Sequence, residues 1–142
     1  CGTGQGFLNV AMQFPNVFCG LIQEPLDAWL FSQINGGNCI SLALNKGYGW
    51  AADMNLKYIF EKLFQDPAGR GYPISRAKSQ EESREYLKGI SISAHKSFGE
   101  ILKDLDAKIL LPIKNREDFM MLLKMCLTWH KKLTISTYTD NY

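Results

Sequence analysis

The sequence lacks the features by which several large classes of proteins are recognised. Its 142 residues contain two histidines and no C-x-x-C pair among four cysteines (Cys1, Cys19, Cys39 and Cys126), which disfavours a zinc or other metal site. No apolar run reaches the roughly 18 residues of a membrane span, and no signal-peptide pattern is present. The net charge of +2 is too small to favour nucleic acid or an anionic membrane. We therefore expect an intracellular protein, cytoplasmic or nuclear, with reduced cysteines and no membrane partner.

The residues that are present are typical of a folded globular protein. Hydrophobic residues make up 46% of the chain and charged residues 21%, a balance that argues against wholesale disorder. A chain of this length suits one domain with one core. We therefore interpret 1–142 as a single domain, with a polar insertion or helix near 66–90.

The first 34 residues predict a turn, a helix, a strand and a second helix, in that order. Apolar residues recur at helical spacing over 5–14, and 17–22 is a short apolar run of the kind found in buried strands. Pro25 suits the first turn of the next helix, whose apolar positions continue to Ile34. Such alternation is typical of the α/β class, with a parallel sheet and helices on both faces.

The remaining elements follow a less regular pattern. The stretch 39–44 fits either a strand or the start of a helix, and 75–88 fits a solvated helix or an insertion. Trp29 and Trp50 are expected to pack in the core. Helices are expected over 53–64, over 97–105 and from Asn115 onwards, and strands over 107–113 and 133–138.

The chain opens with a glycine-rich hexapeptide, Cys1-Gly2-Thr3-Gly4-Gln5-Gly6, and the predicted helix and strand follow it. In this arrangement, 1–34 resembles the opening of class I S-adenosylmethionine-dependent methyltransferases, in which a glycine loop and an acidic residue after the second strand hold the cofactor. The resemblance implies a Rossmann-like sheet and S-adenosylmethionine as the cofactor. It assigns the cofactor contacts to the turn and to the end of the second strand: Cys1, Gly2, Thr3, Gly4, Gln5, Gln23 and Glu24.

Elementary chemistry supports a ligand at such a turn. Glycine lets the backbone turn tightly and approach a ligand closely, and a helix start offers N–H groups to an anionic group. Glu24 lies 20 residues after Gly4, a spacing at which an acid can accept both ribose hydroxyls. The glycines lack the final x-x-G spacing of nicotinamide and flavin sites, which disfavours those cofactors.

The methyltransferase family places a central strand before the glycine loop, and this chain begins inside the loop. We therefore expect that strand upstream of Cys1, as an apolar run followed by an acidic residue, an apolar residue and a glycine. The sequence is accordingly interpreted as a fragment of a longer protein.

The resemblance leaves the methyl acceptor open. Lys114 and Asn115 follow the predicted fourth strand and are candidates for substrate contact. The Asn/Asp/Ser-Pro-Pro-aromatic tetrapeptide of methyltransferases that modify nucleic-acid amines is missing there, so protein lysine, as in the Dot1-like branch, is slightly preferred over RNA as the macromolecular substrate. An inactive methyltransferase fold that assembles with other subunits is the alternative.

A third hypothesis concerns Cys39, which follows a Gly-Gly-Asn segment. This segment resembles the nucleophile region of papain-like cysteine hydrolases, with His130 as the base and Asp140 as the orienting residue. A buried structural cysteine is the simpler interpretation, since free cysteines are often core residues.

Overall fold

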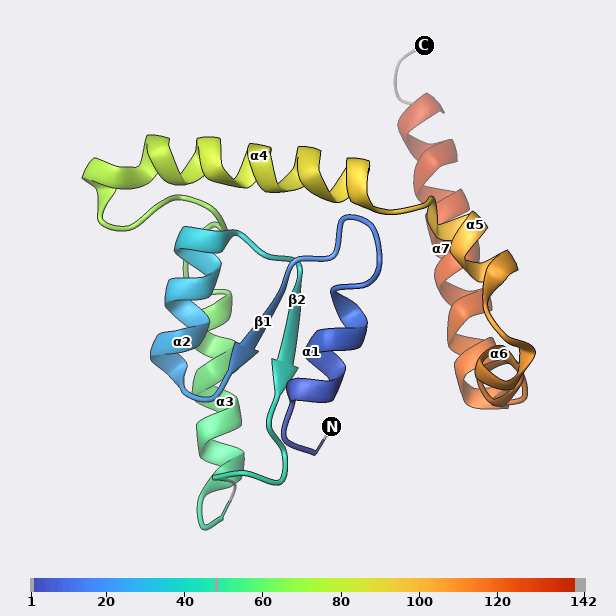
Figure 1. The fold of residues 1–142 in the computed structure, drawn as a ribbon, viewed down its shortest axis with the longest axis horizontal. Coiled ribbons are helices and arrows are strands. Elements are labelled where there is room, and N and C mark those ends of the chain that lie inside the picture. The colour runs from blue at the N-terminus through green and yellow to red at the C-terminus, as the bar shows by residue number, and fades with distance from the viewer. Residues whose placement is uncertain (1, 48, 140–142) are drawn as a thin grey trace. The chain divides into compact units, whose positions relative to one another are not determined.

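Two parallel strands form the centre of the fold. Strand β1 (Cys19–Ile22) pairs with strand β2 (Cys39–Leu42) over their whole lengths. The chain passes from β1 to β2 through α2 (Pro25–Leu30) and a π-helical turn over Phe31–Asn35, because parallel neighbours need a crossover connection. The predicted α/β class with a parallel sheet is confirmed in this coarse form (Figure 1).

The computed structural model describes residues 2–47 and 49–139, with side chains as far as residue 128. The chain divides into two compact units, Cys1–Phe98 and Gly99–Tyr142. Both strands belong to the first unit, whereas the described part of the second unit contains helices alone. Any site built on the sheet therefore belongs to the first unit.

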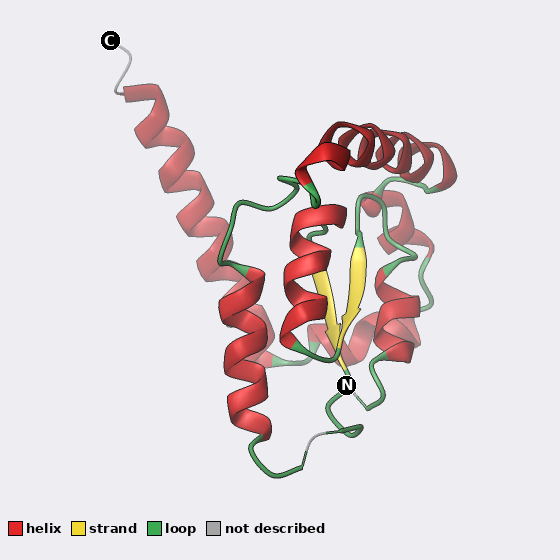
Figure 2. Cartoon of the chain, turned by 90° about the vertical axis from the view of Figure 1, so that its left-hand side faces the viewer, coloured by secondary structure: helices red, strands yellow, loops and turns green. Residues whose placement is uncertain are grey.

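Helices cover both faces of the strand pair. On one face, Ile22 packs with Ala28 of α2 and with Ile59 of α3 (Ala52–Leu63), and these three side chains are fully buried. On the other face lies α1 (Gln5–Ala11), which contacts both strands. Figures 1 and 2 show this order of helix, sheet and helix from two directions. The hydrophobic core of the unit lies between the strands, α2 and α3.

The long helix α4 (Ala77–Ala94) is tied to this unit by the side chain of Arg84. The Arg84 guanidinium donates hydrogen bonds to the Ile34 carbonyl oxygen at 2.9 Å and to the Gly69 carbonyl oxygen at 2.8 Å. In Figure 1, α4 passes the amino-terminal ends of the strands. One arginine therefore connects α4 both to the crossover and to the turn that follows α3.

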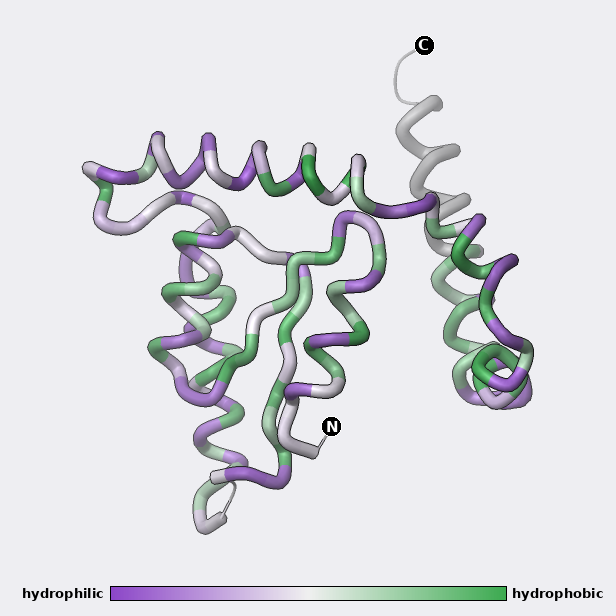
Figure 3. The backbone as a smooth tube through the Cα atoms, viewed as in Figure 1, coloured by the Kyte–Doolittle hydropathy of each residue, from purple (hydrophilic) through white to green (hydrophobic). Residues whose placement is uncertain are grey.

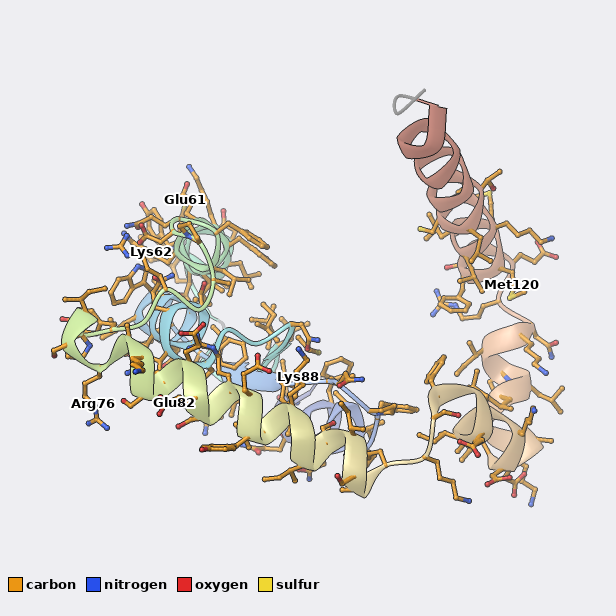
Figure 4. All side chains as sticks on the ribbon, turned by 90° about the horizontal axis from the view of Figure 1, so that it is seen from above. Glu61, Lys62, Arg76, Glu82, Lys88 and Met120 are labelled. Carbon is orange, nitrogen blue, oxygen red and sulfur yellow. The ribbon has the colours of Figure 1, made fainter. Side chains whose placement is uncertain are left out.

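Most residues of α4 are exposed to solvent, which explains why its sequence is rich in charged residues. A short 3-10 turn (Ile74–Arg76) leads into α4. Figure 3 shows that the first half of α4 is mainly hydrophilic. Figure 4 shows Glu82 and Lys88 spaced along it. Of the two interpretations of 75–88, the solvated helix is confirmed.

As far as the structure describes it, the second unit consists of helices. They are α5 (Phe98–Asp104), which begins at the boundary of the units, α6 (Ala107–Lys114) and α7 (Glu117–Thr139). The strands predicted over 107–113 and 133–138 are therefore wrong. Across the described residues, no helix combines the length and the apolar character that crossing a membrane requires.

Local hydrogen bonding explains why these two segments are helical. A strand needs a neighbour to pair its N–H and C=O groups, whereas a helix pairs most of them within the segment. The Asp106 side chain also caps α6, because its Oδ1 accepts a hydrogen bond from the Lys108 N–H at 2.8 Å. Pro112 stands inside α6, where it costs one backbone hydrogen bond without ending the helix.

The two tryptophans that were expected to pack differ in their surroundings. The Trp29 Nε1 donates a hydrogen bond to Asp66 Oδ2 at 2.9 Å, and its ring meets Tyr72 edge to face at 4.9 Å. Trp50 is fully exposed in the loop after β2. The packing prediction is therefore wrong for Trp50.

Replacing Gly4 with alanine is expected to destabilise the first unit. Gly4 has a φ of +80°, and a Cβ there would lie 2.6 Å from Leu21 Cδ1 and 3.3 Å from the Ala43 backbone N. We expect Gly4→Ala to lower the free energy of unfolding by about 1–3 kcal/mol, measured by urea denaturation. Gly6→Ala is the matched control, because no atom lies within 4 Å of its Cβ position and alanine favours a helix. Equal stability of the two variants would contradict the steric argument.

Candidate functional site

The glycine turn lies at the carboxyl edge of the sheet, where β2 and the loop after it hold the turn in place. The Ser41 hydroxyl donates a hydrogen bond to the Gly4 carbonyl oxygen at 2.6 Å, and the Asn45 backbone N–H donates one to the Gly2 carbonyl oxygen at 3.0 Å. Both Ser41 and Gly4 are buried. Open α/β sheets bind their ligands at this edge, so the turn is the candidate site.

Few residues of the glycine turn carry an exposed polar side chain that could contact a ligand. Thr3 is exposed and carries a hydroxyl that can donate and accept a hydrogen bond. Gln5 is the first residue of α1 and is also exposed. Cys1 lies outside the described residues, and it holds the only titratable side chain in the sequence of 1–6.

The second predicted contact segment, Gln23 and Glu24, follows the carboxyl end of β1. The Gln23 backbone is held at both polar groups: its N–H donates to Asp27 Oδ2 at 3.1 Å, and its carbonyl oxygen accepts from Asn55 Nδ2 at 3.1 Å. Glu24 is exposed directly before Pro25, the first residue of α2. Because β1 and β2 are parallel, Gln23 and Glu24 lie at the same edge of the sheet as the glycine turn.

The loop after β2 completes this edge with residues that the sequence analysis did not select. Asn45 contacts Gly2, and the exposed Lys46 follows it directly. Ser41 could have been noticed, because it is a polar residue within the apolar segment 39–44 and a buried hydroxyl needs a partner. Asn45 left no such signal in the sequence.

The other predicted site residues lie elsewhere. Cys39 begins β2 and thus stands at the amino edge of the sheet, at the end opposite to the turn. Lys114 and Asn115 end helix α6 of the second unit, not a strand. The side chain of His130 and the whole of Asp140 are outside the described residues. Among the residues with described side chains, no group of three or more His, Cys, Asp or Glu residues is arranged to hold a metal ion.

Solved structures of sugar isomerases are similar to this chain. A 4-deoxy-L-threo-5-hexosulose-uronate ketol-isomerase complexed with a tartrate is 40% identical, with a TM-score of 0.82. The ribose-5-phosphate isomerase LacAB_rpiB from Vibrio parahaemolyticus is 43% identical, with a TM-score of 0.81. Each similarity covers 85% of this chain and 57% of the solved chain, so the chain spans little more than half the length of these neighbours.

A more distant structure shares the fold alone. The type B ribose 5-phosphate isomerase from Trypanosoma cruzi is 18% identical, with a TM-score of 0.53 over 66% of this chain and 55% of its own. No protein-family model matches the chain, and no curated protein matches it significantly.

These comparisons overturn the functional predictions made from the sequence. The chain is similar to isomerases, so the resemblance to S-adenosylmethionine-dependent methyltransferases and the assignment of that cofactor are wrong. The inactive methyltransferase fold and the cysteine hydrolase that uses Cys39 are wrong for the same reason. A glycine turn before a helix suits many ligands of parallel α/β folds, and it does not by itself identify one.

Removing the Ser41 hydroxyl is expected to loosen the glycine turn. Ser41→Ala deletes the buried hydrogen bond to the Gly4 carbonyl oxygen, which keeps the Leu8 N–H as a donor at 3.0 Å. The free energy of unfolding should therefore fall by only about 1 kcal/mol, measured by urea denaturation. Ser93→Ala removes a similar but exposed hydrogen bond to a carbonyl and should change stability by less than about 0.5 kcal/mol. A larger loss for Ser93→Ala would refute the assignment.

Proposed function

We propose that this chain forms part of a ketol-isomerase that acts on an anionic sugar. The observation that carries the proposal is the identity of 40% and 43% to two solved sugar isomerases over 85% of the chain. Their names specify a hexosulose uronate and a ribose 5-phosphate, which are both sugars with a negatively charged group. An anionic aldose or ketose is therefore the proposed substrate class.

We also propose the finer description of the fold as Rossmann-like. The crossover from β1 to β2 and the helices on both faces of the strands support it. In such sheets the loops at the carboxyl edge carry the ligand contacts, and on this ground we propose that the substrate binds beside the glycine turn.

Ketol isomerisation sets a simple requirement on the site. A base removes a proton from the hydroxyl-bearing carbon next to the carbonyl group, which leaves an enediolate, and a proton is delivered to the former carbonyl carbon. The hydroxyl proton moves to the former carbonyl oxygen, so that the hydroxyl carbon becomes the new carbonyl carbon. No electrons are exchanged with a second reactant. The site therefore needs a proton-transfer group, hydrogen-bond donors for the sugar oxygens and a cation for the charged end.

The proposed roles follow from the sequence of the glycine turn and from the described groups at the carboxyl edge. Cys1 is the candidate base, since it holds the only titratable side chain of 1–6. The exposed hydroxyl of Thr3 is a candidate donor to a sugar oxygen. Lys46 follows the residue that contacts Gly2, and its ammonium group is the candidate partner of the substrate anion.

The proton-transfer role predicts a measurable exchange. The full-length protein should interconvert an aldose and a ketose of the anionic class and incorporate solvent deuterium at the carbon that is deprotonated, followed by NMR in D2O. Cys1→Ser should lower kcat by about 10²–10⁴-fold, because a hydroxyl is a poor base at neutral pH. Cys126→Ser, on exposed Cys126 of α7, is the control and should retain activity. The proposal fails if neither phosphorylated sugars nor sugar acids exchange deuterium.

The anion-binding role predicts a separate effect on substrate affinity. Lys46→Ala should raise KM about 10-fold or more with a smaller change in kcat, since a hydrogen bond to a charged group contributes roughly 1.5–3 kcal/mol. Lys57→Ala is the matched control, because Lys57 is an exposed lysine of α3 that pairs with Glu61 at 3.8 Å. Equal KM values for the two variants in steady-state kinetics would remove Lys46 from the site.

A further inference from the structure

A groove of about 410 Å³ lies between α4 and the amino edge of the sheet, away from the proposed substrate site. Across from α4 it is lined by Met12, by the start of β1 at Cys19 and by the π-helical turn. Such turns are rare and occur frequently at functional sites. All of these elements belong to the first unit. The volume lies within the range of pockets that bind small molecules.

The lining of the groove is mainly apolar and open to solvent. Leu87 of α4 is 50% exposed, and Met12 on the other wall is 41% exposed. Ile90, one helical turn after Leu87, is also exposed and lines the groove. A molecule with an apolar body that entered the groove would remove this surface from water, which is favourable in proportion to the area covered.

The charged and titratable groups of the groove are cationic or neutral. No Asp or Glu is among the described residues that line it. The Cys19 thiol is protonated at neutral pH, because burial, followed by a hydrogen bond to Cys39, raises the pKa of Cys19 to about 12. The other two groups are Arg84 and His95, and His95 Nδ1 lies 2.8 Å from the Ser91 carbonyl oxygen. The groove therefore carries positive charge without a compensating carboxylate.

Arg84 supplies this charge. Its guanidinium is held by two neutral groups, the carbonyl oxygens of Ile34 and Gly69. Among the described residues no carboxylate forms an ion pair with Arg84, and Glu85, the next residue of α4, pairs with Lys88 at 3.8 Å. A guanidinium has five N–H donors, so the two carbonyl contacts leave donors that can bind a carboxylate or a phosphate.

We propose that this groove binds a small amphipathic anion, in which an alkyl or aromatic body carries one carboxylate or phosphate. The anionic group binds Arg84, and the body covers Leu87, Ile90 and Met12. Along α4, Arg84 and Ser91 are about 10 Å apart, which is comparable to the length of an extended octanoate. An anionic sugar suits the groove less well, because its hydroxyl groups would face apolar side chains without hydrogen-bond partners. The proposal does not depend on the isomerase function, since the glycine turn lies at the opposite edge.

The test is isothermal titration calorimetry of the full-length protein with octanoate, octyl phosphate, octan-1-ol and octylamine. At least one of the two anions should bind with one molecule per chain, and the tighter anion identifies the head group. The uncharged alcohol and the amine should bind at least about 10-fold more weakly, because hydrogen bonds between charged groups are the stronger ones. Shortening the anion should lower its affinity about 4-fold for each methylene removed. Failure of both anions to bind, or equal binding of the alcohol, would overturn the proposal.

Two glutamate variants of α4 test the position of the charge. Ser83 lines the groove beside Arg84, whereas Ser93 does not line it. Both serines are exposed, and each hydroxyl donates at 2.9 Å to the carbonyl oxygen four residues earlier. Ser83→Glu should weaken anion binding about 10-fold or more through like-charge repulsion, and Ser93→Glu should leave it unchanged. Equal affinities of these two variants would contradict the proposed site.

Methionine methyl resonances in NMR spectra locate the bound anion. Binding should shift the resonance of Met12 and leave that of Met54 in α3 unchanged, because Met12 lines the groove and Met54 does not. An anion that binds without shifting Met12 would exclude the groove. Arg84→Gln removes the charge and should weaken anion binding about 10-fold or more. Should Arg84→Gln unfold in circular dichroism, since Arg84 also holds α4 in place, the comparison of Ser83→Glu with Ser93→Glu decides.

Discussion

In the first unit, Leu21 lies beside Ser41 and Ile22 beside Leu42, and this parallel register decides which side chain meets which helix. Ile22 and its partner face the core formed with α2 and α3. Leu21 and its partner face Gly4 before α1. A shift of one residue would exchange the two faces, so the core and the glycine turn both depend on the same pairing of two short strands.

The crossover can lie close to the strands because glycine stands at two positions. A Cβ at Gly20 would come within 2.6 Å of the Phe31 ring, and one at Gly37 within 2.1 Å. The Phe31 ring therefore occupies the space that the Cβ atom of any other residue at position 20 or 37 would need. The two edges of the sheet differ in chemistry: Thr3, Asn45 and Lys46 supply hydroxyl, amide and ammonium groups at the carboxyl edge, whereas Cys19 and Cys39 begin the strands at the amino edge.

The sequence could predict two candidate contact segments but not the ligand that they would bind. The sequence pattern placed a ligand at the turn around Gly4 and at Gln23 and Glu24, and these segments share the carboxyl edge. The same pattern could not distinguish a methyl donor from a sugar, because a glycine turn constrains the backbone and not the ligand. Ser41 and Asn45, which hold the turn, lie about 40 residues further along the chain and were brought to it only by folding.

By itself, the sequence determined the early alternation of helices and a strand and the polar character of α4, because these depend on local periodicity and on Pro25 at a helix start. Tertiary structure decided what local patterns leave open. Within the apolar segment 39–44, residues 39–42 form a strand because they pair with β1. Residues 107–113 and 133–138 are helical and pair their backbone groups internally. The periodicity of a segment can be read from its own sequence, whereas the partner with which a strand pairs lies elsewhere in the chain.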